Sequence, residues 1–420
     1  MELKKTSILL FLLLVPISCR YSRSKLPQSL VDLYYLTPPN NTSSDSPPQT
    51  PPQDTFQHAL DLIRSDVGVR GMSATIIDPN GTLISSASNM PGKANPVNTD
   101  MIFGIGSMSK TYIEYCLFQL IESSGYSSNP LTLDSKIGTW LYKGSNPLLA
   151  DSFKTLINPD ITVGQLMNHT SGIYDYQFNP LYIAAILDDT NKVWSPMDIL
   201  RYVSNPSFSP GTQYAYSNTN YILLGMIIEQ LTGNDVLSVF WDQVISPYNF
   251  SHTFMRTLEP VIGNIAVGYE KDINGNYYTA ATFIGSGISL YSSSWVCGNI
   301  VTTSGELARW MSIYYAYQKS HGYIDGADYK RFWSTWNNDE LNALCTTCTA
   351  EYGLCMMKFD LSSIIPGCIV YGHTGRIPGY TGFLMYWPGK DISVAVLMND
   401  YLADRYKVLL ELLEYLSTIY

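Results

Sequence analysis

The chain has 420 residues, of which 45% are hydrophobic and only 14% are charged. This mixture is typical of a globular protein with a large core, and it excludes a disordered chain. The formal charge is −10, from 25 Lys and Arg against 35 Asp and Glu, and there is no long basic run. The electrostatic requirement for binding nucleic acid is therefore missing, and that class of function is excluded.

The N-terminus predicts an export signal rather than part of the fold. Lys4 and Lys5 precede an apolar run about half as long as the roughly 20 residues that span a bilayer. We predict a signal peptide over residues 1–18 and an exported protein, periplasmic or secreted, with no transmembrane span in the mature chain. Cys19 is a possible lipid tether, which would make the protein a membrane lipoprotein. Residues 19–54 are rich in Pro, Ser and Asn, as a solvated linker is.

The remaining residues, 55–420, show no comparable break and predict one large unit. Asn80-Gly81 separates two alternating apolar runs and is a strong hairpin signal. Elsewhere the apolar spacing distinguishes strands from helices. Predicted strands cover 72–77, 82–88, 368–373, 382–387 and 392–398, and predicted helices cover 56–65, 111–123, 161–168, 196–203, 220–231, 305–318 and 403–417.

Strands at both ends of this unit, with helices between them, predict an α/β fold. Its antiparallel sheet is formed by the N- and C-terminal segments and flanked by helices, with a mostly helical lobe inserted. We assign the sheet lobe to residues 55–106 and 297–420 and the helical lobe to residues 107–296.

Six cysteines follow Cys19, and an even number in an oxidising compartment permits disulfides. Cys355 and Cys368 flank a predicted hairpin and are the expected pair. Cys345 and Cys348 predict a local bridge or two free thiols rather than half of a zinc site, because no second ligand pair lies at a suitable spacing. We predict no metal site.

The first chemical motif contains Ser107 and Lys110, where a predicted helix begins after two glycines. Residues three apart lie on one helix face, so the lysine amine can reach the serine hydroxyl. The positive end of the helix favours an oxyanion at the serine, and the amine can take its proton. The motif predicts a nucleophile with its base, although a single Ser-x-x-Lys match also arises by chance.

The second motif pairs Tyr216 with Asn218 just before a predicted helix. A phenol near a cationic lysine is favoured as phenolate, so Tyr216 is a candidate general base. The Asn218 amide is suited to hold a substrate carbonyl. A packed tyrosine and a turn-forming asparagine are the alternative interpretation of the same residues.

The third motif, His373-Thr374-Gly375-Arg376, lies on a predicted strand. Glycine lets a substrate backbone lie against the strand edge. The Arg376 N–H group could then join that of Ser107 in an oxyanion hole. His373 and Arg376 could attract an anionic substrate group, and a surface histidine beside a loop is the alternative.

The order of these motifs resembles the serine β-lactamase-related family, which includes class C β-lactamases, D,D-carboxypeptidases and related esterases. The resemblance spans about 60–400 and includes the segment 161–172. It implies a fold like that of β-lactamases and penicillin-binding transpeptidases, without a cofactor. It also implies an acyl-enzyme mechanism with Ser107 as nucleophile, assisted by Lys110 and Tyr216. Asn218 would position the acyl donor, and His169 is better interpreted as part of a structural turn.

The chain departs from the class C pattern at His373, where those enzymes typically have lysine. The resemblance therefore implies a D,D-carboxypeptidase or esterase that acts on a D-alanyl peptide, amide or ester. The alternatives are a class C-like β-lactamase and a catalytically silent binding protein on the same fold. Histidine carries a full charge only on the acid side of neutrality. If His373 attracts a substrate anion, anionic substrates should lose kcat/KM as the pH rises through neutrality.

Overall fold

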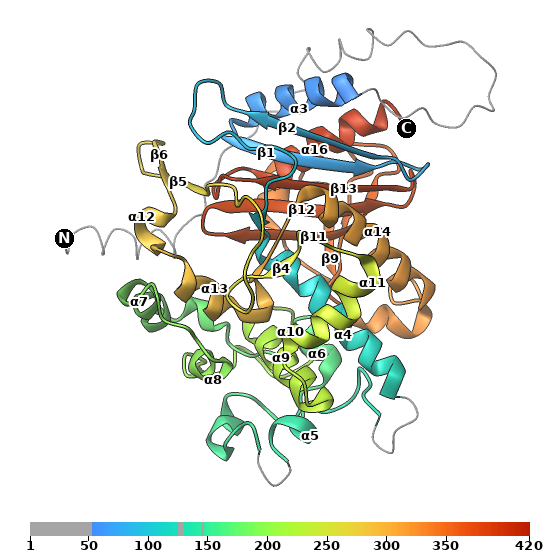
Figure 1. Ribbon diagram of the computed structural model, residues 1–420. Coiled ribbons are helices and arrows are strands. Elements are labelled where there is room, and N and C mark those ends of the chain that lie inside the picture. Colours follow the sequence, from blue (N-terminus) through green and yellow to red (C-terminus); the bar gives the residue numbers. More distant parts are fainter. Residues whose placement is uncertain (1–52, 125–129, 144–146) are drawn as a thin grey trace.

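The computed structural model describes residues 53–124, 130–143 and 147–420 (Figure 1). The predicted signal peptide, Cys19 and all but the end of the predicted linker lie outside these residues. Within the described ranges, no single helix is long and apolar enough to cross a membrane. Helices 218–232 and 236–248 reach that threshold only when they are taken together across an 86° bend.

In the described part of the chain, the main sheet has eight antiparallel strands in the order β2-β1-β13-β12-β11-β10-β9-β8. The two chain ends meet where β1 pairs with β13, with Ala74 opposite Val396. The predicted α/β fold is therefore confirmed (Figure 1). The strands of this sheet are β1 (Gly71–Ile77), β2 (Leu83–Asn89), β8 (Ser334–Thr335), β9 (Thr349–Tyr352), β10 (Met357–Asp360), β11 (Ile369–Ile377), β12 (Tyr380–Trp387) and β13 (Ile392–Met398).

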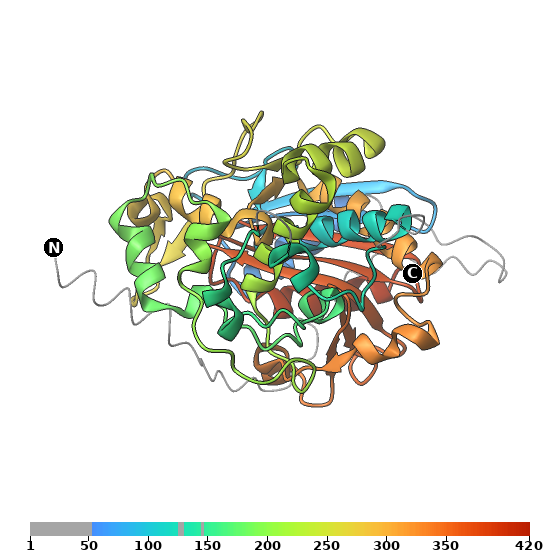
Figure 2. The ribbon, with the colours of Figure 1, turned by 90° about the horizontal axis from the view of Figure 1, so that it is seen from below.

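Helices cover both faces of this sheet. The apolar face of the first helix, with Phe56, Leu60 and Ile63 fully buried, packs with the last helix over one face. Figure 2, seen from below, shows teal and green helices in front of the red strands of the sheet. The main helices are α3 (Gln53–Val67), α4 (Ser109–Ser123), α6 (Val163–Met167), α7 (Pro180–Asp188), α8 (Pro196–Leu200), α9 (Asn218–Thr232), α14 (Ser304–Ser320), α15 (Asp339–Leu344) and α16 (Arg405–Ser417).

Shorter elements lie between the larger ones along the chain. Two small sheets are formed by short strands, and short helices lie between the larger ones. These elements are β3 (Phe103–Gly104), β4 (Phe254–Met255), β5 (Tyr269–Lys271), β6 (Tyr277–Thr279), β7 (Ile300–Thr302), α5 (Gly138–Leu141), α10 (Val236–Phe240), α11 (Ser246–Tyr248), α12 (Ala281–Ile284) and α13 (Ile288–Ser294).

The pairing of β11 leaves part of its edge open, which matters for the site. Strands β8, β9 and β10 were not predicted, and they extend the sheet beyond β11. The β10 ladder ends where Met357 pairs with Gly372. From His373 onward, β11 is therefore paired within the main sheet only on its β12 side. Its other edge has no strand partner in the described part of this sheet.

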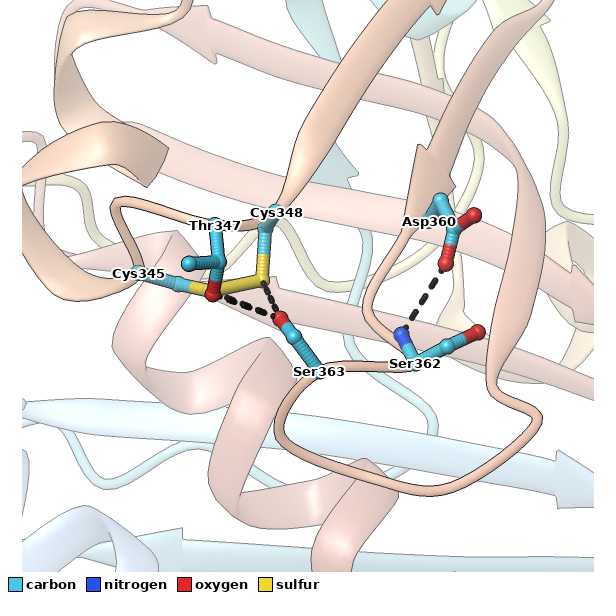
Figure 3. The surroundings of a disulfide bond; sticks show 6 residues. All are labelled: Cys345, Thr347, Cys348, Asp360, Ser362 and Ser363. Carbon is cyan, nitrogen blue, oxygen red and sulfur yellow. Dashed lines mark hydrogen bonds between the residues drawn. A yellow bond between two sulfur atoms is a disulfide. The ribbon is translucent and has the colours of Figure 1, made fainter.

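The predicted Cys355–Cys368 disulfide is wrong. Leu361 N–H donates to the carbonyl of Cys368 at the turn of the β10–β11 hairpin, whereas Cys355 precedes β10 at the opposite end. Both thiols are free and buried. The disulfide joins Cys345 to Cys348, which is the local bridge that the sequence left open, and it lies beside Ser363 (Figure 3). No metal-binding group of three or more His, Cys, Asp or Glu side chains occurs among the described residues.

Candidate active site

Two glycines bring the Ser107 loop against β11 at Gly375 and Arg376. Ser107 lies in a single 3₁₀ turn that leads into α4, and Gly106 before it has φ +53°. A Cβ on Gly106 would lie 2.6 Å from the carbonyl oxygen of Arg376, and one on Gly375 would lie 2.0 Å from that of Ile105. Any larger residue would separate the two backbones. The glycines therefore place Ser107 beside Arg376, as an oxyanion hole of their N–H groups requires.

Lys110 connects Ser107 to Asn218 and Cys297 through hydrogen bonds. It is fully buried on the first turn of α4, and its Nζ donates to Ser107 Oγ at 3.1 Å. The same Nζ donates to Asn218 Oδ1 at 2.7 Å and to the carbonyl oxygen of Cys297 at 2.8 Å. All three acceptors are uncharged, so burial lowers the pKa of Lys110 to about 8. A substantial fraction of this amine is neutral near physiological pH.

Asn218 has a different environment from the predicted one. Its carbonyl oxygen faces Lys110, and its Nδ2 donates to Asp175 Oδ2 at 2.8 Å and to Gln177 Oε1 at 3.0 Å. The amide thus separates the lysine from a buried carboxylate. Burial raises the pKa of Asp175. The hydrogen bonds from Gln177 and Asn218 and the charge of Lys110 oppose this rise.

Sequence analysis did not identify Asp175 or Gln177. The sequence does contain a signal for a turn, because it has an Asp two residues before a Gln. In the structure, the Asp175 side chain accepts a hydrogen bond from the Gln177 N–H and caps a short turn. That signal predicts a turn. It does not show that the turn folds against α9.

Tyr216 reaches the site as predicted, but not as a phenolate. Lys110 Nζ lies 5.0 Å from the centre of its ring, and the Ser107 hydroxyl is close enough to oppose the rise in its pKa. Burial dominates and raises the pKa of Tyr216 well above its usual value. Its hydroxyl has no hydrogen bond of good geometry within the described residues. The expectation of a phenolate base is therefore wrong, because the penalty of burial exceeds the stabilisation that the Ser107 hydroxyl gives to the phenolate.

The His169 ring packs against the Tyr216 ring. It is fully buried with φ +59°, and its Nδ1 accepts from the Ser217 N–H at 3.1 Å. Its ring centre lies 4.1 Å from that of Tyr216. Burial lowers its pKa well below the usual value, so the ring stays neutral. This geometry agrees with the structural turn that was predicted for His169.

His373 is a buried neutral ring and does not titrate near neutrality. Its Nδ1 donates to the Thr374 carbonyl oxygen at 2.6 Å, and its Nε2 accepts from the Tyr352 hydroxyl at 3.0 Å. Burial lowers its pKa to about 3, and the Lys110 charge adds to this. The expected loss of charge through neutrality is therefore wrong. Sequence analysis missed Tyr352 because it lies on the unpredicted strand β9.

The other residues of the third motif, 374–376, lie on β11, and the sequence predicts a strand for this motif. The Thr374 hydroxyl is buried beside Met357 Sδ. Gly375 provides the close approach to the Ser107 loop. The Arg376 side chain ion-pairs with Glu340 of α15. The structure thus brings together all the predicted residues, and their assignment to individual catalytic steps stays a prediction.

Comparisons with known proteins agree with this fold. The sequence profile of the family described as Beta-lactamase matches residues 54–413. Penicillin-binding protein 4 of Amycolatopsis lactamdurans is 22% identical over 366 residues, which cover 84% of this chain and 86% of that protein. Penicillin-binding protein 4* of Bacillus subtilis is 28% identical over 194 residues, 44% of this chain and 38% of that one. The match thus spans less than half of the Bacillus protein.

Solved structures show the same fold. D-amino acid amidase from Ochrobactrum anthropi SV3 aligns with a TM-score of 0.67 and 20% identity, over 87% of this chain and 97% of that one. A D-stereospecific amidohydrolase from Streptomyces sp. aligns with a TM-score of 0.64 and 24% identity, over 86% and 98%. Since the family profile covers most of the sequence and the Ser107–Lys110 site lies within it, the chain belongs to the beta-lactamase family, as a hydrolase with Ser107 as its candidate nucleophile.

Proposed function

We propose that this protein hydrolyses amide or ester bonds of D-amino acid derivatives through an acyl-enzyme on Ser107. The observation that carries the proposal is the 3.1 Å hydrogen bond from Lys110 Nζ to Ser107 Oγ, made by a buried amine whose pKa is about 8. A lysine with a pKa this close to neutrality can act as a general base, whereas an ordinary lysine is protonated.

The steps follow from this geometry. The neutral Lys110 amine takes the proton of Ser107 Oγ while that oxygen bonds to the substrate carbonyl carbon. The charge on the carbonyl oxygen develops beside the N–H groups of Ser107 and Arg376. The tetrahedral intermediate then breaks its bond to the leaving nitrogen or oxygen, which takes back the proton. The neutral Tyr216 hydroxyl is placed to pass that proton. Water cleaves the acyl-enzyme by the reverse sequence.

The D-amino acid preference is supported by the relatives, two of which are a D-amino acid amidase and a D-stereospecific amidohydrolase. A D-alanyl peptide substrate is supported by the penicillin-binding relatives. The neutral His373 supports the same choice against dedicated β-lactamase activity, because the cation that class C enzymes typically have at this position is missing.

Labelling and turnover test the proposal together. A fluorophosphonate or a fluorescent penicillin should label the protein, and peptide mapping should place the label on Ser107, with Ser107→Ala as the unlabelled control. Turnover is then compared among D-amino acid amides, their L-enantiomers, D-Ala-D-Ala peptides, short-chain esters and a chromogenic cephalosporin. Label on any other residue contradicts the mechanism. A folded protein that turns over none of these substrates is the silent binding protein, and preferential cephalosporin turnover identifies a β-lactamase.

We also propose that the chain is exported, which the Lys4-Lys5 pair and the apolar run that follows it support. Expression of the full chain followed by cell fractionation tests this, with removal of residues 1–18 as the control. Equal retention of both forms inside the cell would contradict export.

A further inference from the structure

A cavity of about 280 Å³ lies between α8 and the second half of α9. Residues 195–197 at the start of α8 and Leu148 line it together with Met226, Glu229 and Gln230 of α9. Gln230 at its rim is exposed, whereas Met226 is only 5% exposed, so the cavity opens at the surface and has a buried floor. We call it the α8–α9 cavity.

This cavity is separate from the catalytic residues, although it shares a helix with them. Asn218, which accepts from Lys110, is the first residue of α9, and Glu229 lies near the other end of that helix. The two residues are about three helical turns, or about 16 Å, apart along the axis. Neither Ser107 nor any residue that it contacts lines the α8–α9 cavity. A molecule bound there would therefore touch none of the groups that the proposed reaction uses.

Glu229 is the charged residue among those that line the cavity, and no cation compensates it there. Its Oε1 accepts from the Val236 N–H at 3.1 Å. None of the ion pairs in the described part of the chain includes Glu229. Burial raises the pKa of this carboxyl, and the hydrogen bond from Val236 opposes the rise. A cation beside Glu229 would offset the cost of holding its charge away from water.

The rest of the cavity favours an organic cation over an anion or a metal ion. Glu229 lies in the last turn of α9, where the helix dipole is negative and adds to the attraction for a cation. One carboxylate is too few oxygen ligands for Ca²⁺ or Mg²⁺, whereas it is enough for an ammonium group. Methionine side chains also adapt to the shape of an apolar ligand. The apolar lining residues are Leu148, Pro196, Met197 and Met226.

We propose that the α8–α9 cavity binds a small organic ammonium ion, with its charged group at Glu229 and its apolar body against Met197 and Met226. The cavity volume of about 280 Å³ lies just below the roughly 300–1,000 Å³ that is typical of sites for drug-sized ligands. The ligand is therefore a primary amine with a single ring or a short alkyl chain. This site goes beyond the reaction at Ser107 and does not depend on it.

Binding of three matched compounds tests the proposal. 2-Phenylethylammonium is the probe for the site, 2-phenylethanol lacks its charge, and 3-phenylpropanoate has the opposite charge. NMR of isotope-labelled methionine methyl groups gives the dissociation constants, and Met197→Leu and Met226→Leu identify the two signals. We expect the ammonium ion to shift both signals and to bind about 3–10-fold more tightly than the alcohol, as one half-exposed ion pair allows. The propanoate should bind more weakly than the alcohol.

Variants separate the cavity from the overall charge. Glu229→Gln keeps an oxygen for the Val236 N–H but loses the charge, so the preference for the ammonium ion over the alcohol should fall close to one. Asp242→Asn removes the same charge from an exposed residue that does not line the cavity, and it should leave the preference unchanged. Met197→Trp fills part of the cavity and should weaken the binding of both compounds several-fold. A melting temperature near that of the wild type shows that each variant keeps the fold.

Met108 distinguishes this cavity from the active site, because it is buried next to Ser107 in sequence and its methyl group lies beside Gly375. A shift confined to Met108 would place the ammonium ion at the active site and overturn the proposal. The absence of any methionine shift would also overturn it. So would equal affinities for the ammonium ion and the alcohol, or an unchanged preference in Glu229→Gln.

Discussion

Two lysine clusters in this protein, one buried and one partly exposed, show how surroundings decide what a lysine does. Lys110 is fully buried, and its three acceptors are a hydroxyl, an amide oxygen and a backbone carbonyl. Lys407 of α16 directly contacts two carboxyl groups, with Nζ 2.5 Å from Asp66 Oδ2 and 3.7 Å from Glu411 Oε1. The first lysine has an amide between itself and the nearest carboxylate, whereas the second has none.

The proton affinity of the two clusters differs accordingly. Burial without a contacting anion lowers the pKa of Lys110 to about 8. In the second cluster burial raises the pKa of Glu411 to about 8, and the neighbouring Asp66 adds to this rise. A buried lysine next to neutral acceptors loses its proton more easily and can act as a base. Lys407 lies next to carboxylates and forms ion pairs that link α3 to α16. We therefore expect the first cluster, but not the second, to take part in the proposed reaction.

The largest expected effect comes from removing Lys110, the proposed general base. Lys110→Ala should reduce acylation of Ser107 by at least a few hundredfold, because general-base assistance contributes roughly 10²–10⁴-fold. Tyr216→Phe should fall in the same range or somewhat less. The rate of fluorophosphonate labelling measures both. Lys407→Ala is the matched control at the other lysine cluster and should label at the wild-type rate. Parental labelling by Lys110→Ala would rule out the proton-transfer scheme.

The pH dependence of acylation is the next test of the difference between the Lys110 and Lys407 clusters. Because the lowered pKa of Lys110 lies at about 8, the neutral amine becomes tenfold rarer with each pH unit below that value. The kcat/KM for a neutral ester should therefore rise about tenfold from pH 7 to pH 9 and then level off. The His373 pKa of about 3 places its titration well below this range. A profile that is flat from pH 7 to 9 would contradict Lys110 as the base.

Much of the fold could be predicted because local patterns dominate at the chain ends. The Asn80-Gly81 turn and the alternating runs of β1, β12 and β13 each lie within one short segment. The short strands β8, β9 and β10 escaped prediction because their stability comes from pairing onto β11, which local spacing does not show. The error at Cys355 and Cys368 has the same cause, since their separation depends on the register of that hairpin.

The candidate site shows a similar limit. Residue types at a helix start could identify Ser107 and Lys110, since residues three apart share a helix face. The protonation states of Tyr216 and His373 could not be predicted, because they depend on burial by distant segments. Tyr352 of β9 is the hydrogen-bond donor to His373, and it is 21 residues away in sequence. Tertiary packing, rather than the motif, thus determines which groups carry charge.

Asp175→Asn is expected to have a smaller effect. The charge of Asp175 raises the pKa of Lys110, so its removal should lower the apparent pKa of the acylation profile and leave more neutral amine near pH 7. The asparagine can still accept from the Asn218 amide, so Ser107 labelling at pH 9 should change only a few-fold. Asp175→Ala, which also removes that acceptor, should reduce kcat at every pH. An upward shift of the profile in Asp175→Asn would contradict the proposed separation of Lys110 from its counter-ion.

The smallest effect is expected in the second cluster, from Glu411→Gln. The pKa of this carboxyl rises from 4.5 to about 8 on folding, so above pH 4.5 the unfolded chain releases a proton that the folded chain keeps. The contribution of this group to stability is therefore fully present below about pH 4.5 and is lost as the pH rises towards 8. Glutamine stays neutral at every pH and can donate to Asp66. The melting temperature of the Glu411→Gln variant should match that of the wild type at pH 4.5. At pH 8 it should exceed the wild-type value by about 1–3 °C, as a gain of about 1 kcal/mol in the free energy of unfolding implies for a domain of this size. The exposed Asp242→Asn is the control, and Ser107 labelling should be the same in all three proteins. A variant that is less stable than wild type at pH 8 would mean that Glu411 is a needed anion for Lys407, and the two lysine clusters would then differ less than their contacts indicate.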